Sequence, residues 1–257
     1  MELVPARNKL VFSGEPIYNI CSHDLKTFLF SISHMFLPDV EFTIQVTNTC
    51  DIGVMIKSVN QYKIDDLINN KQVCVLIYNN IVHKDSMLYE FINNSIIYRN
   101  FMTFHQNDDS IREQIHNLFT AISAPKLLCI GGECYIFPKL FKDVKLIDIY
   151  SDFIEICDIA KLNNTNASCN HINYNTAELY YNDYDVCVIN TGKAGCGLNL
   201  CMNLATIKPK DIYIISCNKK SFDNDLRILK QCYRIDLAFN FANKLYGIQV
   251  YKLKLVQ

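Results

Sequence analysis

The chain has 257 residues, of which 50% are hydrophobic and 20% are charged, and its formal net charge is −1. This composition excludes an intrinsically disordered chain and allows one large domain or two modest ones, each with its own core. The near-neutral charge excludes a general electrostatic attraction to polyanions, so a nucleic-acid site would need a local basic patch.

The first hundred residues alternate between β-branched runs and polar connections. Residues 41–46 and 73–78 have the composition of strands. Residues 63–70 lie between these runs and form a polar connection in which a helix is consistent with the pattern. The sequence therefore predicts a small α+β domain over residues 1–100, with its boundary near residues 98–104.

The pattern changes in residues 101–257. Polar capping residues at 107–110 precede apolar positions at helical spacing, which predicts a helix over residues 109–124 that ends before Pro125. Four apolar strands then alternate with helical segments. The strands are expected at residues 127–130, 145–149, 186–189 and 212–215, and the helical segments at 152–162 and 198–205. This alternation predicts an α/β domain with a Rossmann-like, doubly wound, mostly parallel sheet.

Two polar features follow the first two strands of this predicted sheet, at the edge where doubly wound folds bind ligands. Gly131-Gly132 would let the backbone approach a cofactor closely, although any tight strand-to-helix turn uses glycine. Asp148 could accept hydrogen bonds from both ribose hydroxyls of a nucleoside cofactor, or it could cap the following helix. Its spacing after the glycine turn favours the ribose role.

Two more segments follow the later strands. Residues 190–195 contain two glycines and Lys193, which could meet a phosphate, but they lack the spacing of a P-loop and equally fit a flexible polar loop. Ser216-Cys217-Asn218 places a thiol after the last strand. That thiol is either a nucleophile, if its proton is removed, or a small buried apolar residue. The neighbouring Lys219 and Lys220 add positive charge or form a solvated turn.

The sequence also limits metals, membranes and compartments. It has twelve cysteines but no basic, apolar signal segment after Met1, so we expect reduced thiols in the cytoplasm or another reducing compartment, with an organelle left open. The cysteine pairs Cys129/Cys134 and Cys196/Cys201 lack the spacing of a zinc site, so no metal is expected. Polar residues interrupt every apolar run before the roughly 20 residues that span a membrane, so no membrane partner is expected.

Taken in order, these segments resemble the S-adenosylmethionine-dependent RNA (uracil-C5)-methyltransferases, which form 5-methyluridine in tRNA and rRNA. Phe104-His105-Gln106-Asn107 is similar to the family's Phe-x-Gln-x-Asn stretch, and residues 127–137 to its cofactor loop. Residues 190–195 resemble its Asp-Pro-Pro-Arg-x-Gly loop. Residues 213–218 resemble its Tyr-x-Ser-Cys-Asn-Pro motif, which is the most specific match. The resemblance covers residue 95 to the C-terminus.

The resemblance implies a class I methyltransferase fold, S-adenosylmethionine as cofactor and RNA as partner. In this family a cysteine adds to C6 of uracil, C5 takes the methyl group, and a carboxylate base removes the C5 proton before the cysteine leaves. Cys217 would be the nucleophile, and residues 1–100 would help to grip the RNA. The implied cofactor-binding residues are Gln106, Gly131, Gly132, Asp148 and Asn190, and the implied substrate-binding residues are Lys193 and Asn218.

Several positions depart from the family pattern. The family's glutamate base lies in a His-x-Glu context, and the matching residues here are Ile248 and Gln249, neither of which is a carboxylate. An amide cannot accept the proton at neutral pH. Asn190 replaces an aspartate, and Lys193 replaces an arginine. A lysine cannot form the bidentate hydrogen bonds of an arginine. The second glycine of the cofactor loop is replaced by Glu133 or Cys134, and a proline by Lys219.

These departures predict an RNA-binding protein of the methyltransferase type whose catalysis is impaired or lost, and whose cofactor binding is itself in question. One alternative is an active enzyme in which another carboxylate, such as Asp225 or Asp236, serves as the base. A second alternative is a structural subunit of a ribonucleoprotein or viral assembly, with a protein partner. A basic groove beside Cys217 would favour RNA, and a broad apolar patch would favour protein assembly.

Overall fold

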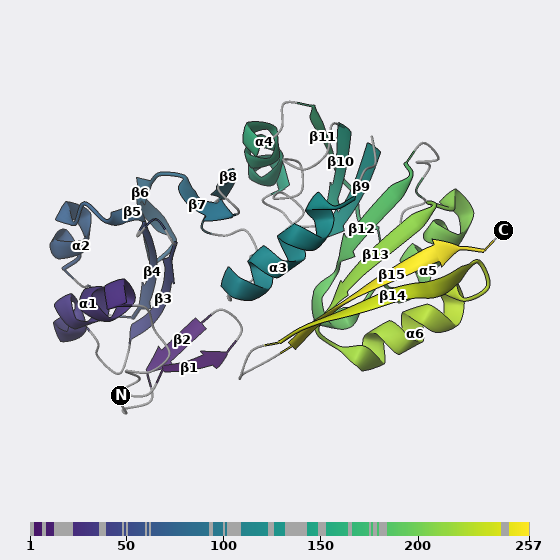
Figure 1. The fold of residues 1–257 in the computed structure, drawn as a ribbon. Helices are drawn as coiled ribbons and strands as arrows, with labels where there is room; N and C mark the ends of the chain where they lie inside the picture. Colours follow the sequence, from purple (N-terminus) through teal and green to yellow (C-terminus); the bar gives the residue numbers. More distant parts are fainter. Residues whose placement is uncertain are drawn as a thin grey trace. The chain divides into compact units, whose positions relative to one another are not determined.

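In the computed structural model, the chain forms two units, Met1–Phe101 and Met102–Gln257 (Figure 1). The structure describes residues 3–6, 9–12, 23–35, 40–47, 49, 51–59, 61, 63–92, 95–99, 101, 109–122, 126–131, 143–148, 153–163, 166–174, 176, 179, 184–242 and 247–256.

The first unit contains a four-stranded sheet in the order β3-β4-β5-β6. The strands are β3 (Val40–Val46), β4 (Ile52–Ser58), β5 (Val73–Tyr78) and β6 (Ile81–Asp85). Only β4 and β5 pair in parallel, and the chain passes between them through α2 (Asp65–Asn69). The strands expected at 41–46 and 73–78 are confirmed. Strands β4 and β6 were not predicted.

Other elements complete this unit. Helix α1 (His23–Ser31) is followed by the short turn η1 (Ser33–Met35), and two hairpins are formed by β1 (Leu3–Ala6) with β2 (Lys9–Phe12) and by β7 (Leu88–Ile92) with β8 (Ser95–Arg99). The core packs α1 and α2 against the sheet through apolar side chains that include Phe28, Phe42, Ile56, Leu67 and Leu76. The pattern is that of an α+β unit.

A buried ion pair anchors the β7–β8 hairpin within the first unit. Arg99 Nε lies 3.6 Å from Glu90 Oε2, and both side chains are 1% exposed. Arg99 Nη1 also donates to Gln45 Oε1 on β3 at 2.5 Å, and Gln45 Nε2 donates to the Phe101 carbonyl at 2.8 Å. The ion pair joins β7 to β8 within the hairpin, and the hydrogen bond from Arg99 to Gln45 ties the hairpin to β3 of the sheet.

The second unit is built on a seven-stranded sheet in the order β11-β10-β9-β12-β13-β15-β14 (Figure 1). The strands are β9 (Lys126–Gly131), β10 (Asp143–Asp148), β11 (Ala167–His171), β12 (Val186–Asn190), β13 (Asp211–Ser216), β14 (Tyr233–Ala242) and β15 (Gly247–Leu255). Strands β9 to β13 run parallel, whereas β15 is antiparallel to both of its neighbours. Numbered along the chain, the strand order is 3-2-1-4-5-7-6, and the predicted doubly wound, mostly parallel sheet is confirmed.

Helices pack on both faces of this sheet. They are α3 (Asp109–Thr120), α4 (Phe153–Asn163), α5 (Gly197–Ile207) and α6 (Lys219–Leu229), and the short turn η3 (Gly192–Ala194) precedes α5. On one face α6 packs through Phe222, whose ring stacks on Tyr251 at 3.5 Å between centroids. On the other face Phe119 of α3 meets Tyr213 edge-on at 5.2 Å. Because the sheet is covered on both sides, its central strands β9 and β12 are almost wholly buried.

Candidate functional site

Four of the predicted segments lie at one edge of the large sheet. Strands β10, β9, β12 and β13 are parallel neighbours in that order, so their carboxyl ends meet at this edge. Strand β10 ends at Asp148 and Cys217 directly follows β13, and these two strands are three strand spacings apart, about 14 Å. Between them, β9 and β12 are the neighbours at which the strand order reverses, and this is where doubly wound folds bind ligands.

Gly131 lies at the point of reversal, opposite Asn190 in the pairing of β9 with β12. Its φ is +88°, and a Cβ built on it would lie 2.3 Å from the carbonyl oxygen of Asn190. Any larger residue would therefore clash with backbone as well as adopt an unfavourable conformation. Asn190 is itself buried, at 8% exposure. The glycine is thus required where the two strand ends come closest.

Cys217 is exposed, so the alternative that it is a small buried apolar residue is wrong. The turn around it is held by its neighbours: Ser216 Oγ donates to the Asn218 carbonyl at 3.1 Å and accepts from the Asn218 N–H at 3.2 Å. Asn218 caps α6, because its Oδ1 accepts from the Lys220 N–H at 3.1 Å. The turn therefore presents the thiol at the sheet edge.

The start of α6 is bound to the loop that follows β12. Asn218 Nδ2 donates to the Lys193 carbonyl at 3.0 Å, and Ser221 Oγ donates to the same carbonyl at 2.7 Å. The Asn218 amide is therefore engaged at both its oxygen and its nitrogen. The side chain of Lys193 is exposed. These bonds tie the loop bearing Lys193 to the segment bearing Cys217.

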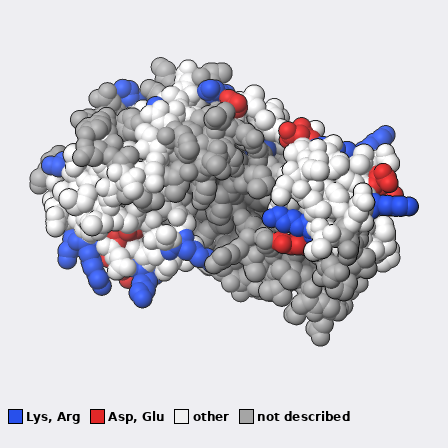
Figure 2. Space-filling view, turned by 180° about the vertical axis from the view of Figure 1, so that it is seen from behind, with Lys and Arg blue, Asp and Glu red and all other residues white. Residues whose placement is uncertain are grey.

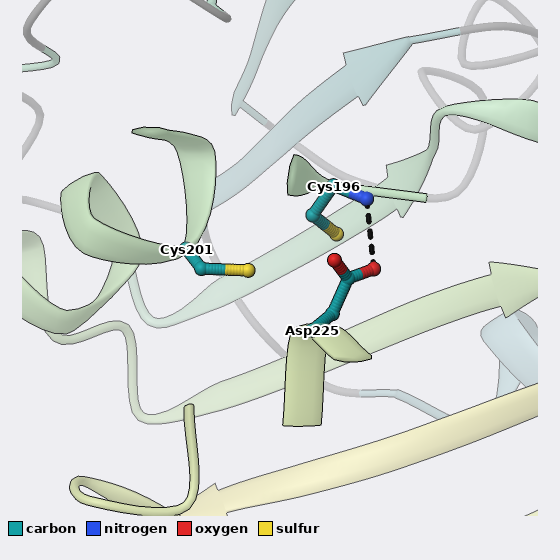
Figure 3. A group of neighbouring side chains, drawn as sticks. All are labelled: Cys196, Cys201 and Asp225. Atoms are coloured by element: carbon teal, nitrogen blue, oxygen red, sulfur yellow. Dashed lines mark hydrogen bonds between the residues drawn. The ribbon is translucent and has the colours of Figure 1, made fainter. Parts of the chain in front are cut away.

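Asp225 lies one helical turn after Ser221 on α6, and its buried carboxylate binds the end of the same loop. One carboxylate oxygen accepts from the Cys196 N–H at 2.8 Å (Figure 3), and the other accepts from the Gly197 N–H at 3.0 Å. Gly195 makes room for this contact, because a Cβ there would lie 2.6 Å from Asp225 Oδ2. A side-chain carboxylate from α6 thus satisfies the first N–H groups of α5.

Both carboxylates considered as replacement bases are engaged elsewhere. Asp225 is 3% exposed and bonded to the start of α5, and Asp236 on β14 lies 3.2 Å from Lys252 Nζ. The Cys196 thiol lies beside Asp225. Its pKa is raised well above the usual value by a hydrogen bond with the Cys201 side chain and by burial. The arrangement therefore does not favour an active enzyme based on Asp225 or Asp236.

The position expected for a base is occupied by an amide. Gln249 of β15 lies directly opposite Ser216 in the pairing of β13 with β15, so it is adjacent to the segment that carries Cys217. Its Nε2 donates to Asn240 Oδ1 at 2.9 Å, and its Oε1 accepts from the Tyr251 hydroxyl. The neighbouring Ile248 is 5% exposed and belongs to the core. Of the two residues expected in place of a carboxylate, the register therefore places Gln249, rather than Ile248, opposite Ser216.

Positive charge near Cys217 is modest. Lys219 Nζ lies 2.7 Å from Asp223 on the same helix, which raises the pKa of the lysine, and Lys220 is exposed. On the face drawn in Figure 2, Lys and Arg side chains lie in small separate groups, some of them beside Asp or Glu. The view shows no continuous basic stripe among the residues that it describes.

Some expected site residues lie outside the described part of the chain, and some elements of the structure were not expected. Gln106 and Gly132 lie outside the described residues, as do Glu133 and Cys134. Sequence reasoning missed α6, for which Asn218 was an available capping signal, and it missed Asp225 as a structural partner of the loop. In the part of the chain that the structure describes, no helix is long and apolar enough to cross a membrane.

Comparison with known proteins identifies the fold. No family model and no curated protein matches the chain. The tRNA (uracil-54, C5)-methyltransferase of Pyrococcus abyssi, solved with S-adenosyl-L-homocysteine, superposes with a TM-score of 0.65 at 15% identity, over 90% of this chain and 65% of that one. Weaker likenesses are a TehB-like S-adenosylmethionine-dependent methyltransferase of Corynebacterium glutamicum (TM-score 0.45, 16% identity, 58% of this chain and 90% of that one) and the N-methyltransferase NodS of Bradyrhizobium japonicum (0.46, 14%, 59% and 90%).

The chain thus spans about two thirds of the length of the Pyrococcus abyssi protein, and at 15% identity the likeness concerns the fold. The second unit has the fold of the class I, Rossmann-like methyltransferases.

Proposed function

We propose that this protein is an RNA-binding member of the S-adenosylmethionine-dependent RNA (uracil-C5)-methyltransferase type whose methyl-transfer turnover is impaired or lost. The observation that carries the proposal is the position of Gln249, an amide opposite Ser216 where a carboxylate base is expected. The fold likeness to a tRNA (uracil-54, C5)-methyltransferase supports RNA as the partner class.

The carboxyl edge of β9, β10 and β12 fits the cofactor. The cradle at Gly131 and Asn190 has no room for a Cβ, and β10 ends on a carboxylate at Asp148 that suits a ribose. These three residues, with Gln106 and Gly132 by resemblance, would hold S-adenosylmethionine. When bound, it supplies an electrophilic methyl group.

The chain's own groups support only part of the reaction. Because Cys217 is exposed at the same edge, its thiolate can add to C6 of a uracil and make C5 nucleophilic. A base must then take the proton from C5 before the sulfur leaves. Gln249 cannot accept that proton at neutral pH, and its amide is already bonded to Asn240 and Tyr251. Methylation of C5 would therefore leave RNA covalently attached to Cys217.

The test is to incubate the full-length protein with tRNA or rRNA transcripts and S-adenosylmethionine labelled in the methyl group. We expect a labelled protein–RNA adduct on a denaturing gel, at no more than one equivalent, with little free 5-methyluridine. Cys217→Ala should abolish the adduct, and Gln249→Glu should convert it into turnover. Gln249→Met is the control for side-chain shape. Repeated turnover by the unaltered protein would contradict the loss of catalysis, and failure to bind either S-adenosylmethionine or RNA would overturn the proposal as a whole.

The first unit, Met1–Phe101, is our candidate for binding the RNA. The outer face of the β7–β8 hairpin carries Tyr89, Phe91 and Ile96, which are 38%, 46% and 38% exposed. Tyr89 lies opposite Tyr98 and Phe91 opposite Ile96 in the strand pairing. Aromatic side chains on such a face stack on unpaired bases with little dependence on sequence.

A structural role in an assembly is a second candidate. Strand β14 ends the large sheet and exposes Ile235 and Leu237, at 45% and 49%. A register shift between these two residues and the Asp236–Lys252 ion pair beside it are features that discourage pairing with another strand. These features argue against assembly through β14, and a stable complex with protein that forms only through β14 would favour the assembly role.

A further inference from the structure

Three buried side chains with metal-binding atoms meet where α5 begins beside α6. The sulfur atoms of Cys196 and Cys201 and a carboxylate oxygen of Asp225 all lie within 4.8 Å of one another (Figure 3). The three residues are 1%, 0% and 3% exposed. Among the residues that the structure describes, they form a group of donors that does not belong to the edge bearing Cys217.

The donor set has a clear chemical preference. Two thiolates and one carboxylate suit Zn²⁺ or another thiophilic divalent cation. Ideal Zn–S and Zn–O bonds place donor atoms about 3.5 Å apart in a tetrahedron. The three donor atoms here lie within 4.8 Å of one another, so they would have to approach more closely to bind one ion.

The carboxylate is already positioned for such a role. The backbone N–H groups of Cys196 and Gly197 hold one oxygen each, at 2.8 and 3.0 Å, and the Cys196 thiol also donates to the carboxylate. Loss of the thiol proton on metal binding would free that acceptor position. Ligating carboxylates are characteristically fixed by hydrogen bonds of this kind. The plane of the Asp225 carboxylate is thus set before any metal arrives.

The charge of Asp225 gives a second, independent argument. No Lys, Arg or His in the described part of the chain lies within ion-pair distance of this buried carboxylate. Its partners are backbone N–H groups at the start of α5, where the helix dipole provides only a partial positive charge. A Zn²⁺ ion with two thiolates and this carboxylate has the same net charge as the carboxylate with two neutral thiols, so binding leaves the charge of the site unchanged and gives the buried carboxylate a direct cationic partner.

We propose that Cys196, Cys201 and Asp225 bind one Zn²⁺ ion, with solvent as the fourth ligand. Binding converts both thiols to thiolates and releases two protons to solvent. The ion then bonds the start of α5 to α6, in addition to the hydrogen bonds of Asp225. The five-residue spacing of the cysteines and the position of Asp225 on the next helix explain why no zinc pattern is visible in the sequence. The inference does not depend on the proposed function.

The test uses the reduced, metal-free, full-length protein and Zn²⁺ alone. Calorimetry should show one equivalent of Zn²⁺ bound, and Co²⁺ should give the near-ultraviolet thiolate charge-transfer band and the visible bands of a tetrahedral site. The thermal unfolding midpoint should rise with Zn²⁺. Cys201→Ser should lose the spectrum and weaken binding at least about tenfold, as expected for disturbed ligation.

The matched control is Cys187→Ser on β12, because Cys187 is also 0% exposed and belongs to the same core. This variant should keep the Co²⁺ spectrum even if its stability falls. Asp225→Asn should weaken Zn²⁺ binding while circular dichroism confirms that the variant is folded. Absence of Zn²⁺ binding by the unaltered protein, or an unchanged Co²⁺ spectrum in Cys201→Ser, would overturn the proposal and leave Asp225 as a helix cap only. Neither readout uses S-adenosylmethionine or RNA, so failure here is separate from failure of the proposed function.

Discussion

Gly131 and Gly192 both have positive φ, +88° and +72°, but their surroundings differ. A Cβ at Gly131 would meet the Asn190 carbonyl at 2.3 Å, whereas a Cβ at Gly192 would meet nothing within 4 Å. At Gly131, both steric overlap and the positive φ therefore require glycine, whereas at Gly192 only the positive φ favours it.

Gly131→Ala should lower the free energy of unfolding by about 3 kcal/mol, because backbone overlap adds to the unfavourable φ. Gly192→Ala should cost only about 1 kcal/mol. Urea denaturation of the two variants measures both values. Equal losses would mean that the ends of β9 and β12 separate easily, and the tight cradle for a cofactor would then be wrong.

At the scale of single elements, α3 carries a buried histidine that makes stability depend on pH. His116 is 1% exposed, and burial lowers its pKa from 6.5 to about 4. The folded protein therefore keeps this imidazole neutral at a pH where the unfolded chain protonates it. Its contribution to stability is complete above pH 6.5 and is lost as the pH falls toward about 4.

The resulting loss of unfolding free energy is on the order of 2 kcal/mol, after allowance for solvent screening. His116→Gln should flatten the dependence of the denaturation midpoint on pH across this interval. The exposed His83 on β6 is the control, and His83→Gln should leave the profile as it is. If the denaturation midpoints of both variants still depend on pH as strongly as that of the unaltered protein, other groups cause the acid sensitivity.

The β7–β8 hairpin permits a second test at this scale. If bases stack on its outer face, Tyr89→Ala should weaken the binding of single-stranded RNA by about 1–3 kcal/mol, or at least about fivefold. Phe30→Ala is the matched control, because Phe30 on α1 is an aromatic residue of the same unit with 80% exposure. Filter binding or fluorescence anisotropy measures both. Equal weakening by the two variants would indicate general damage to the unit, and no effect of Tyr89→Ala would remove the hairpin as an RNA contact.

At the scale of the whole molecule, four of the five parallel strands of the large sheet were predicted from their apolar, β-branched residues, namely β9, β10, β12 and β13, whereas β11 (Ala-Ser-Cys-Asn-His) lacks such a run and was missed. Strands β14 and β15 were missed, since exposed and charged residues interrupt their apolar pattern. The strand order brings one edge of the sheet together from Gly131, Asp148, Asn190 and Cys217. Residue spacing and family resemblance together could suggest that order.

The contacts of Asp225 lay beyond such reasoning. Its partners are 28 and 29 residues away in sequence, and only the packing of α5 on α6 brings them together. Likewise, sequence alone left the choice between Ile248 and Gln249 open. The pairing of β13 with β15 was needed to place Gln249 opposite Ser216.

The position of β15 in the sheet also has a consequence for how the protein is made. Residues 247–255 insert between β13 and β14, so β14 reaches the sheet only through a strand that is synthesised after it. During translation, β9 to β13 can assemble while β14 still has no partner. The large sheet is therefore completed only when residues 247–255 have left the ribosome, and until then β13 and β14 each lack the strand that later pairs with them, which leaves edges to protect from aggregation.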